Sequence, residues 1–113
     1  MESIQVFGKS TCKTTQKVVD WLNSHKFDIE YVDIISSPPS KKFLDSNVDS
    51  DNIKPFLNSR SKIYRENNMS SKLPGKNEAI KMMLKDPNLI KRPVIVTSSG
   101  NMFGFDEDFL KSL

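Results

Sequence analysis

The chain contains a single cysteine, Cys12, inside the segment VFGKSTCKTTQKVVDWL. An apolar run precedes this cysteine, and residues with helical spacing follow it. The first backbone N–H groups of a helix have no partner within the helix, and together with the helix dipole they favour a negative charge. Lys9, Lys13 and Lys17 flank the cysteine, and residues 3–19 contain no acid. Such surroundings can lower the pKa of a thiol from about 8.5 to about 3.5–7.5. The pattern predicts a reactive thiol, with an inert small residue as the alternative.

Two arginines are further candidates for the chemistry of this thiol. Arg60 lies in NSRSKIYRE and Arg92 lies in KRPVIV. Each is a surface group unless the fold brings it to Cys12. Pro93 follows Arg92 at the start of an expected strand, where a cis peptide bond would be a specific structural feature. The single His and the single Cys are far apart in sequence, so we expect no structural metal site.

The elements that would position these residues can be identified from their patterns. SIQVFG and FDIEYVDI are typical of strands, and residues 14–25 between them have helical spacing. This order predicts a βαβ unit with parallel strands. Residues 40–86 contain short helical patches and no convincing strand. PVIV and NMFGF then predict a hairpin, and Asp106 is expected to cap a final helix.

The length and composition limit the classes of function. With 113 residues, of which 36% are hydrophobic, the chain fits one domain with a modest core. The net charge of +3 is not clustered as direct nucleic-acid binding requires. No apolar run is long enough to cross a membrane. A lone cysteine and the absence of a signal-like N-terminus favour the cytoplasm.

Four segments resemble the arsenate reductase ArsC/Spx family, in the family's order and spacing. They are STCKTTQKVVDWL, NSRSKIYRE, LIKRPVIV and GFDEDFLKSL. The resemblance is nearer the ArsC-like and Spx-like branches than the true arsenate reductases. It implies an α/β, thioredoxin-like fold with a mixed four-stranded sheet. In that fold a βαβ and ββα frame (residues 1–37 and 88–113) holds a helical insertion at about residues 38–87.

The resemblance also implies roles for individual residues. Cys12 would be the redox-active thiol, and the Arg92–Pro93 peptide bond would be cis. The expected anion or substrate site comprises Thr14, Thr15, Arg60 and Arg92, with weaker contributions from Lys9 and Gln16.

The chain departs from the family pattern at three positions. Thr15 stands where many members have a second cysteine, so an internal disulfide switch is impossible. Gln16 replaces a frequent arginine. Phe105 stands where the arsenate reductases have a third arginine, and losing such a donor to a charged ligand costs about 2–3 kcal/mol.

Together these observations predict a thiol-dependent oxidoreductase with a single cysteine. The Cys12 thiolate would attack an oxyanion or a disulfide, and glutathione or a glutaredoxin would clear the intermediate. No bound cofactor is expected. One alternative is a transcriptional regulator of the Spx type that binds the alpha subunit of RNA polymerase. The other is a family member without redox activity.

Overall fold

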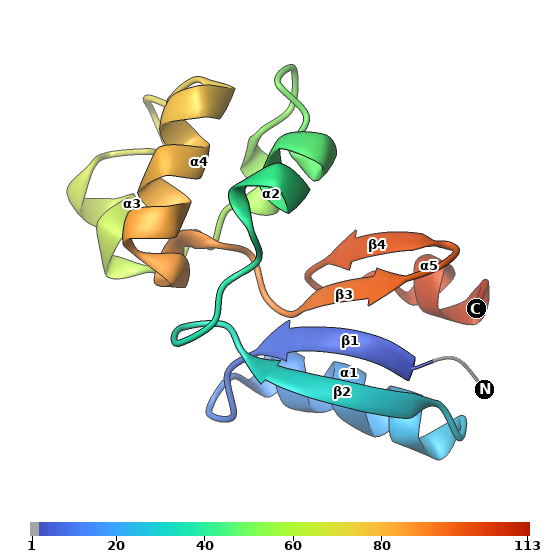
Figure 1. Cartoon of the computed structure of the whole chain (residues 1–113). Coiled ribbons are helices and arrows are strands. Elements are labelled where there is room, and N and C mark those ends of the chain that lie inside the picture. Colours follow the sequence, from blue (N-terminus) through green and yellow to red (C-terminus); the bar gives the residue numbers. More distant parts are fainter. Residues whose placement is uncertain (1–2) are drawn as a thin grey trace. The chain divides into compact units, whose positions relative to one another are not determined.

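The computed structural model describes residues 3–113, which form two compact units. The first unit joins the described residues up to Asp33 to Arg92–Leu113, and the second comprises Ile34–Lys91. Figure 1 shows the elements of both. No helix in the described part of the chain is long and apolar enough to cross a membrane.

The first unit is built on a mixed four-stranded sheet. Strands β1 (Ser3–Gly8) and β2 (Asp28–Asp33) are parallel, as the βαβ pattern predicts. Strand β3 (Val94–Thr97) pairs antiparallel with β1, and β4 (Gly100–Phe103) pairs antiparallel with β3. The strand order is therefore β2-β1-β3-β4, which leaves β2 at one edge. This arrangement confirms the α/β, thioredoxin-like fold.

Helices α1 (Lys13–Ser24) and α5 (Glu107–Lys111) cover the same face of this sheet (Figure 1). Asp106 caps α5 as expected, because its carboxylate accepts a hydrogen bond from the Phe109 N–H. The buried residues between the helices and the sheet are Ile4, Val6, Val18, Leu22, Ile95, Met102 and Leu110. Burial of these aliphatic side chains fixes the register that carries β1 into α1.

The second unit consists of short helices. They are α2 (Lys41–Asn47), α3 (Lys62–Glu66), α4 (Lys76–Lys85) and the 3-10 turns η1 (Lys54–Phe56) and η2 (Pro87–Leu89). Residues 34–91 form two isolated bridges and no strand, which includes the range 40–86 where none was expected. Ile80 and Met83 are buried, so the apolar stripe of α4 belongs to a core.

The second unit extends beyond the predicted insertion at residues 38–87. The unit ends later than predicted because residues 90 and 91 pair through backbone hydrogen bonds with the segment before α3. Ile90 forms a bridge with Leu57, and the Lys91 N–H donates to the Phe56 carbonyl over 3.0 Å. Such pairing between distant residues leaves no local pattern in the sequence.

Strand β2 is less buried than its alternating pattern suggests. Ile29 is half-buried, and Tyr31 on the same face is 45% exposed. The reason is its position, because an edge strand has one neighbouring strand and α1 covers it only in part. The strand itself is confirmed, while its aromatic side chain remains open to solvent beside the first helix.

Candidate functional site

Cys12 occupies the N-cap of α1, directly after the turn that follows β1. Its N–H donates to the Lys9 carbonyl over 2.9 Å, and its own carbonyl accepts from the Gln16 N–H over 3.1 Å. Its backbone is extended, with φ −84° and ψ 119°. The thiol is half-buried. The cysteine therefore lies where the unpaired N–H groups of the helix begin.

Gly8 and Thr15 determine how closely the turn approaches the helix. Thr15 is 1% exposed, and a Cβ atom on Gly8 would collide with its methyl group. The Thr15 hydroxyl also accepts a hydrogen bond of 3.4 Å from the Lys9 N–H. A glycine at the end of β1 thus allows Thr15 to pack under the turn that presents Cys12.

The surroundings of Cys12 favour its thiolate. Burial of the thiol opposes ionisation, but hydrogen bonds outweigh it and lower the pKa of Cys12 to about 7. The donors, in decreasing order, are the Thr15 side chain, the Thr15 backbone, the Arg92 side chain and the Thr14 backbone. A pKa near 7 makes about half of the thiol an anion at neutral pH. The structure therefore brings Thr14, Thr15 and Arg92 to the cysteine.

Arg92 reaches Cys12 from the segment that leads into β3. The Arg92–Pro93 peptide bond is cis, the isomer that the family resemblance implies. Pro93 is buried, and its carbonyl accepts a hydrogen bond of 2.9 Å from the Gly104 N–H. This bond ties the start of β3 to the end of β4 and supports the backbone next to Arg92.

Arg60 lies in the second unit, in an exposed turn before α3. Its approach to Cys12 stays a prediction. Sequence reasoning missed Asn58, which holds this turn. The Asn58 N–H donates to the Leu89 carbonyl over 2.7 Å, and its amide donates to the Asn88 carbonyl over 3.1 Å. Its side-chain oxygen accepts from the Arg60 N–H over 3.1 Å.

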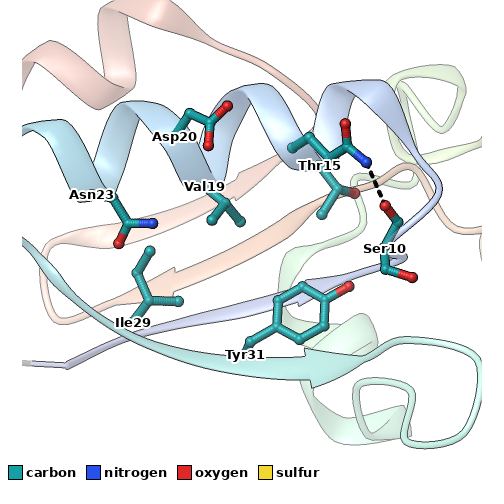
Figure 2. Close-up of a pocket in the computed structure, with 8 residues that line it drawn as sticks. Ser10, Thr15, Val19, Asp20, Asn23, Ile29 and Tyr31 are labelled. Carbon is teal, nitrogen blue, oxygen red and sulfur yellow. Dashed lines mark hydrogen bonds between the residues drawn. The ribbon is translucent and has the colours of Figure 1, made fainter.

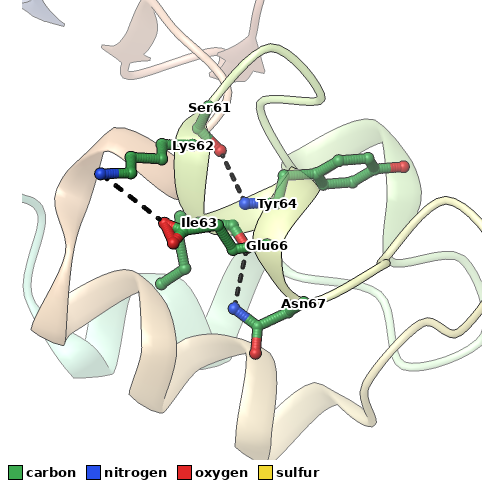
Figure 3. A network of polar contacts seen from close by, with 6 residues as sticks. All are labelled: Ser61, Lys62, Ile63, Tyr64, Glu66 and Asn67. Carbon is green, nitrogen blue, oxygen red and sulfur yellow. Dashed lines mark hydrogen bonds and ion pairs between the residues drawn. The ribbon is translucent and has the colours of Figure 1, made fainter.

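The helix that follows the Arg60 turn is held by local contacts, shown in Figure 3. The Ser61 hydroxyl accepts from the Tyr64 N–H over 3.3 Å and so caps α3. Lys62 and Glu66 form an exposed pair at 4.0 Å, and the Asn67 amide donates to the Ile63 carbonyl. Asn58 accepts from the Arg60 N–H, and the next residue, Ser61, caps α3, so the backbone at Arg60 is held on both sides.

Gln16 and Lys17 have structural partners of their own. The Gln16 amide donates to the Ser10 carbonyl over 2.6 Å and braces the cysteine turn. The Lys17 ammonium lies 4.2 Å from the centre of the Phe105 ring, a cation–π contact. Lys9 contributes its backbone N–H to Thr15, as described above. The predicted contributions of the Lys9 and Gln16 side chains to anion binding stay predictions.

Tyr31 is a further residue near the thiol that sequence patterns did not identify. Its pKa is raised, first by partial burial and then by the charges of Asp33 and Cys12. The electrostatic effect of Cys12 on Tyr31 places the phenol within the field of the thiolate. Within residues 3–113, no group of three His, Cys, Asp or Glu side chains could hold a metal ion.

Comparisons with known proteins identify the family and the fold of the chain. Residues 7–113 match the ArsC family. The uncharacterized protein YusI of Bacillus subtilis is 31% identical over 110 residues, which cover 94% of this chain and 93% of YusI. The global transcriptional regulator Spx of Streptococcus pyogenes is 25% identical, over 96% of this chain and 83% of the regulator.

Solved structures show the same fold. An ArsC family related protein from Bacteroides fragilis superposes with a TM-score of 0.86 and 25% identity, over 96% of this chain and 95% of that one. An arsenate reductase from Vibrio cholerae has a TM-score of 0.80 and 18% identity, over 98% of both chains. At 18% identity, the likeness to the Vibrio cholerae protein shows a shared fold and nothing more. On the match of nearly its whole length, this chain belongs to the ArsC family.

Proposed function

We propose that this protein is a single-cysteine thiol oxidoreductase that exchanges disulfides through Cys12. The observation that supports the proposal best is the lowered pKa of Cys12, about 7, with three residues donating hydrogen bonds to its sulfur. A thiol is most effective as an attacking group when its pKa lies near the ambient pH. Cys12 meets this requirement in neutral solution, and its partial exposure gives a substrate access.

The proposed reaction has two exchange steps. In the first, the Cys12 thiolate attacks one sulfur of a disulfide, so that a new S–S bond forms and the old one breaks. The leaving thiolate takes the electron pair and then a proton from water. In the second, an external thiolate attacks the mixed disulfide, which restores the Cys12 thiolate and releases a new disulfide.

The second thiol must come from another molecule because the chain has no other cysteine. Glutathione and glutaredoxin are the proposed donors. The hydroxyl of Thr15 can hydrogen-bond the thiolate but cannot attack a mixed disulfide. The proposal thus predicts that the mixed disulfide accumulates when no reducing thiol is present.

An oxyanion such as arsenate is a less favourable substrate for this site. The arsenate reductases that the sequence resembles have a third arginine where this chain has Phe105. Here the Phe105 ring instead contacts the Lys17 ammonium. We propose that Arg92, and Arg60 if it approaches Cys12, stabilise anionic groups of a disulfide substrate.

The test is to expose the reduced protein to glutathione disulfide and to follow its intact mass. We expect one glutathione adduct, mapped to Cys12, that disappears after glutathione or glutaredoxin is added. Cys12→Ser is the control and should gain no mass. A wild-type protein that stays unmodified at millimolar glutathione disulfide at pH 7.5 would rule out the proposed exchange and favour a family member without redox activity.

A regulatory role is the second candidate, because the Spx regulator is 25% identical over 96% of this chain. We propose to test it by binding to the purified alpha subunit of RNA polymerase. Retention with a micromolar dissociation constant would support a role of the Spx type. If the protein reacts at Cys12 but does not bind the subunit, the regulatory role is excluded and the oxidoreductase is the supported function.

A further inference from the structure

Strand β2 has a neighbouring strand on one side only. It pairs with β1, and the strand order β2-β1-β3-β4 places it at an edge of the sheet. An edge strand presents a row of backbone N–H and C=O groups that can pair with another extended chain. β2 has six residues and β4, at the other edge, has four, so β2 is the longer of the two edges.

One face of β2 borders a pocket of about 420 Å³ beside α1 (Figure 2). Its lining includes Val19 and Asn23 from α1 and Ile29 and Tyr31 from β2. Figure 2 shows Val19 pointing from the helix toward the strand. Among the described residues, Tyr31 and Leu73 are the exposed large hydrophobic side chains. The edge of the sheet thus carries an aromatic ring and a pocket that can take an aliphatic side chain.

The opposite face of β2 is acidic. Asp28 and Glu30 are two residues apart, so they share this face, and both are exposed. Neither carboxylate forms an ion pair with a described residue. Their partners on β1, Ser3 and Gln5, are uncharged. A chain added beside β2 would therefore meet two carboxylates on this face and the pocket on the other.

These two faces specify the side chains of an added strand. Successive side chains of a strand point to opposite faces, so every second side chain would lie beside the pocket and the others beside the carboxylates. Opposite charges on neighbouring strands are stabilising, and like charges are destabilising. A second copy of β2 does not match, because its own acids would lie beside Asp28 and Glu30. The matching segment alternates apolar and basic residues.

We propose that the edge of β2 binds an extended segment of a partner protein in which apolar and basic residues alternate. The backbone of the segment pairs with β2 and extends the four-stranded sheet. Its apolar side chains enter the pocket beside Tyr31, and its lysine or arginine side chains pair with Asp28 and Glu30. Backbone hydrogen bonds supply affinity in this mode of recognition, and the alternate side chains supply specificity. The inference is independent of the proposed function, because Cys12 does not belong to this surface.

The first experiment titrates the isotope-labelled protein with the synthetic peptide acetyl-KVKVKV-amide. The amide chemical shifts of residues 28–33 should change, and amides of β2 should exchange more slowly with solvent. A peptide with glutamate in place of lysine should not bind, and neither should KKKVVV, which has the same composition without the alternation. If β2 is unaffected by millimolar KVKVKV, the proposal is overturned, and the acids serve only to keep the edge from pairing.

Variants of the two acids test the match of charges. Asp28→Asn and Glu30→Gln should each weaken binding of KVKVKV about two- to five-fold, the range for an exposed charge pair. Asp51→Asn is the matched control, since Asp51 is an exposed acid of the second unit, and it should leave the affinity unchanged. Equal losses in the three variants would indicate general attraction of a cationic peptide, and equal affinities would indicate no role for the acids. Either result would overturn the proposal.

Peptides with N-methyl groups test the backbone pairing separately. Alternate N–H groups of an added strand point toward its neighbour, and an N-methyl group removes a donor. Methylation of one set of amides, either those of the lysines or those of the valines, should therefore abolish binding, while methylation of the other set should preserve it. The same effect from both sets would show that side chains alone hold the peptide and would refute the added strand.

Discussion

Replacement of Thr15 by valine should raise the pKa of Cys12 and slow the reaction of its thiol at neutral pH. The Thr15 side chain is the leading hydrogen-bond donor to the cysteine sulfur. Valine has nearly the same shape as threonine, and it keeps the methyl group that packs against Gly8. The substitution therefore removes the hydrogen bond to the thiolate and the long 3.4 Å bond from the Lys9 N–H, while it preserves the packing against Gly8.

The expected magnitude follows from the value of that hydrogen bond. A hydrogen bond to a charged group contributes about 1.5–3 kcal/mol, and water replaces part of it because the Cys12 thiol is half-buried. A net loss of about 1.4 kcal/mol corresponds to about one unit of pKa. The pKa of Cys12 would then rise from about 7 to about 8. The thiolate fraction at pH 7 would fall from about a half to about a tenth, so the rate should drop about fivefold.

The assay is the rate of alkylation by iodoacetamide between pH 5 and pH 10, which reports the pKa of the thiol. The wild-type curve should have its midpoint near pH 7, and the Thr15→Val curve about one unit higher. Above pH 9.5 the two rates should converge, because both thiols are then ionised. Thr15→Ser retains the hydroxyl and should keep the wild-type midpoint. A Thr15→Val midpoint within 0.3 units of the wild type, with folding intact, would refute the role given to this hydroxyl.

Four further variants test the same reasoning by their stability in urea. Gly8→Ala should cost about 1–3 kcal/mol by overpacking against Thr15, and the double variant with Thr15→Ser should recover part of the loss. Asn58→Ala should cost about 1–3 kcal/mol, because the Asn88 carbonyl loses its side-chain donor and the Arg60 N–H loses its side-chain acceptor, and amide exchange should increase in the turn that contains residue 60. The pKa of Cys12 in the folded protein, about 7, lies below that of a thiol in the unfolded chain. The thiolate therefore contributes its full stabilisation above about pH 8.5, and this contribution is lost as the pH falls through 7. The unfolding free energy of the wild type relative to Cys12→Ser should therefore rise by about 1 kcal/mol from pH 6.5 to pH 9, after allowance for solvent screening, and a flat difference would contradict the lowered pKa.

Local patterns in the sequence were enough to predict the frame of the first unit. The apolar residues of β1 and the helical spacing of α1 depend on neighbours along the chain, so strand, turn and helix were all predicted near their observed bounds. The order of strand, turn and helix is enough to predict that Cys12 lies at the start of the helix. The contact of Arg92 with the cysteine could not be derived locally, because it depends on β3 pairing with β1. The family resemblance predicted it.

Other features of the site depend on pairings that local patterns do not record. Tyr31 looks like a buried strand residue in the sequence, but the strand order places β2 at the edge and leaves the ring exposed. Asn58 looks like an ordinary turn residue, and its function arises from carbonyl groups about 30 residues later in the chain. Thr14 was predicted as a member of the anion or substrate site without a specified group, and its backbone N–H is the group that lowers the pKa of Cys12.

The replacement of a second cysteine by Thr15 connects the ionisation of Cys12 with its proposed substrates. A thiol at position 15 would compete for the mixed disulfide and release the substrate thiol within the same molecule. A hydroxyl stabilises the attacking thiolate and leaves that disulfide intact, so the bound thiol must stay until an external thiol arrives. The threonine at position 15 thus favours both ionisation of the attacking thiol and a long-lived mixed disulfide.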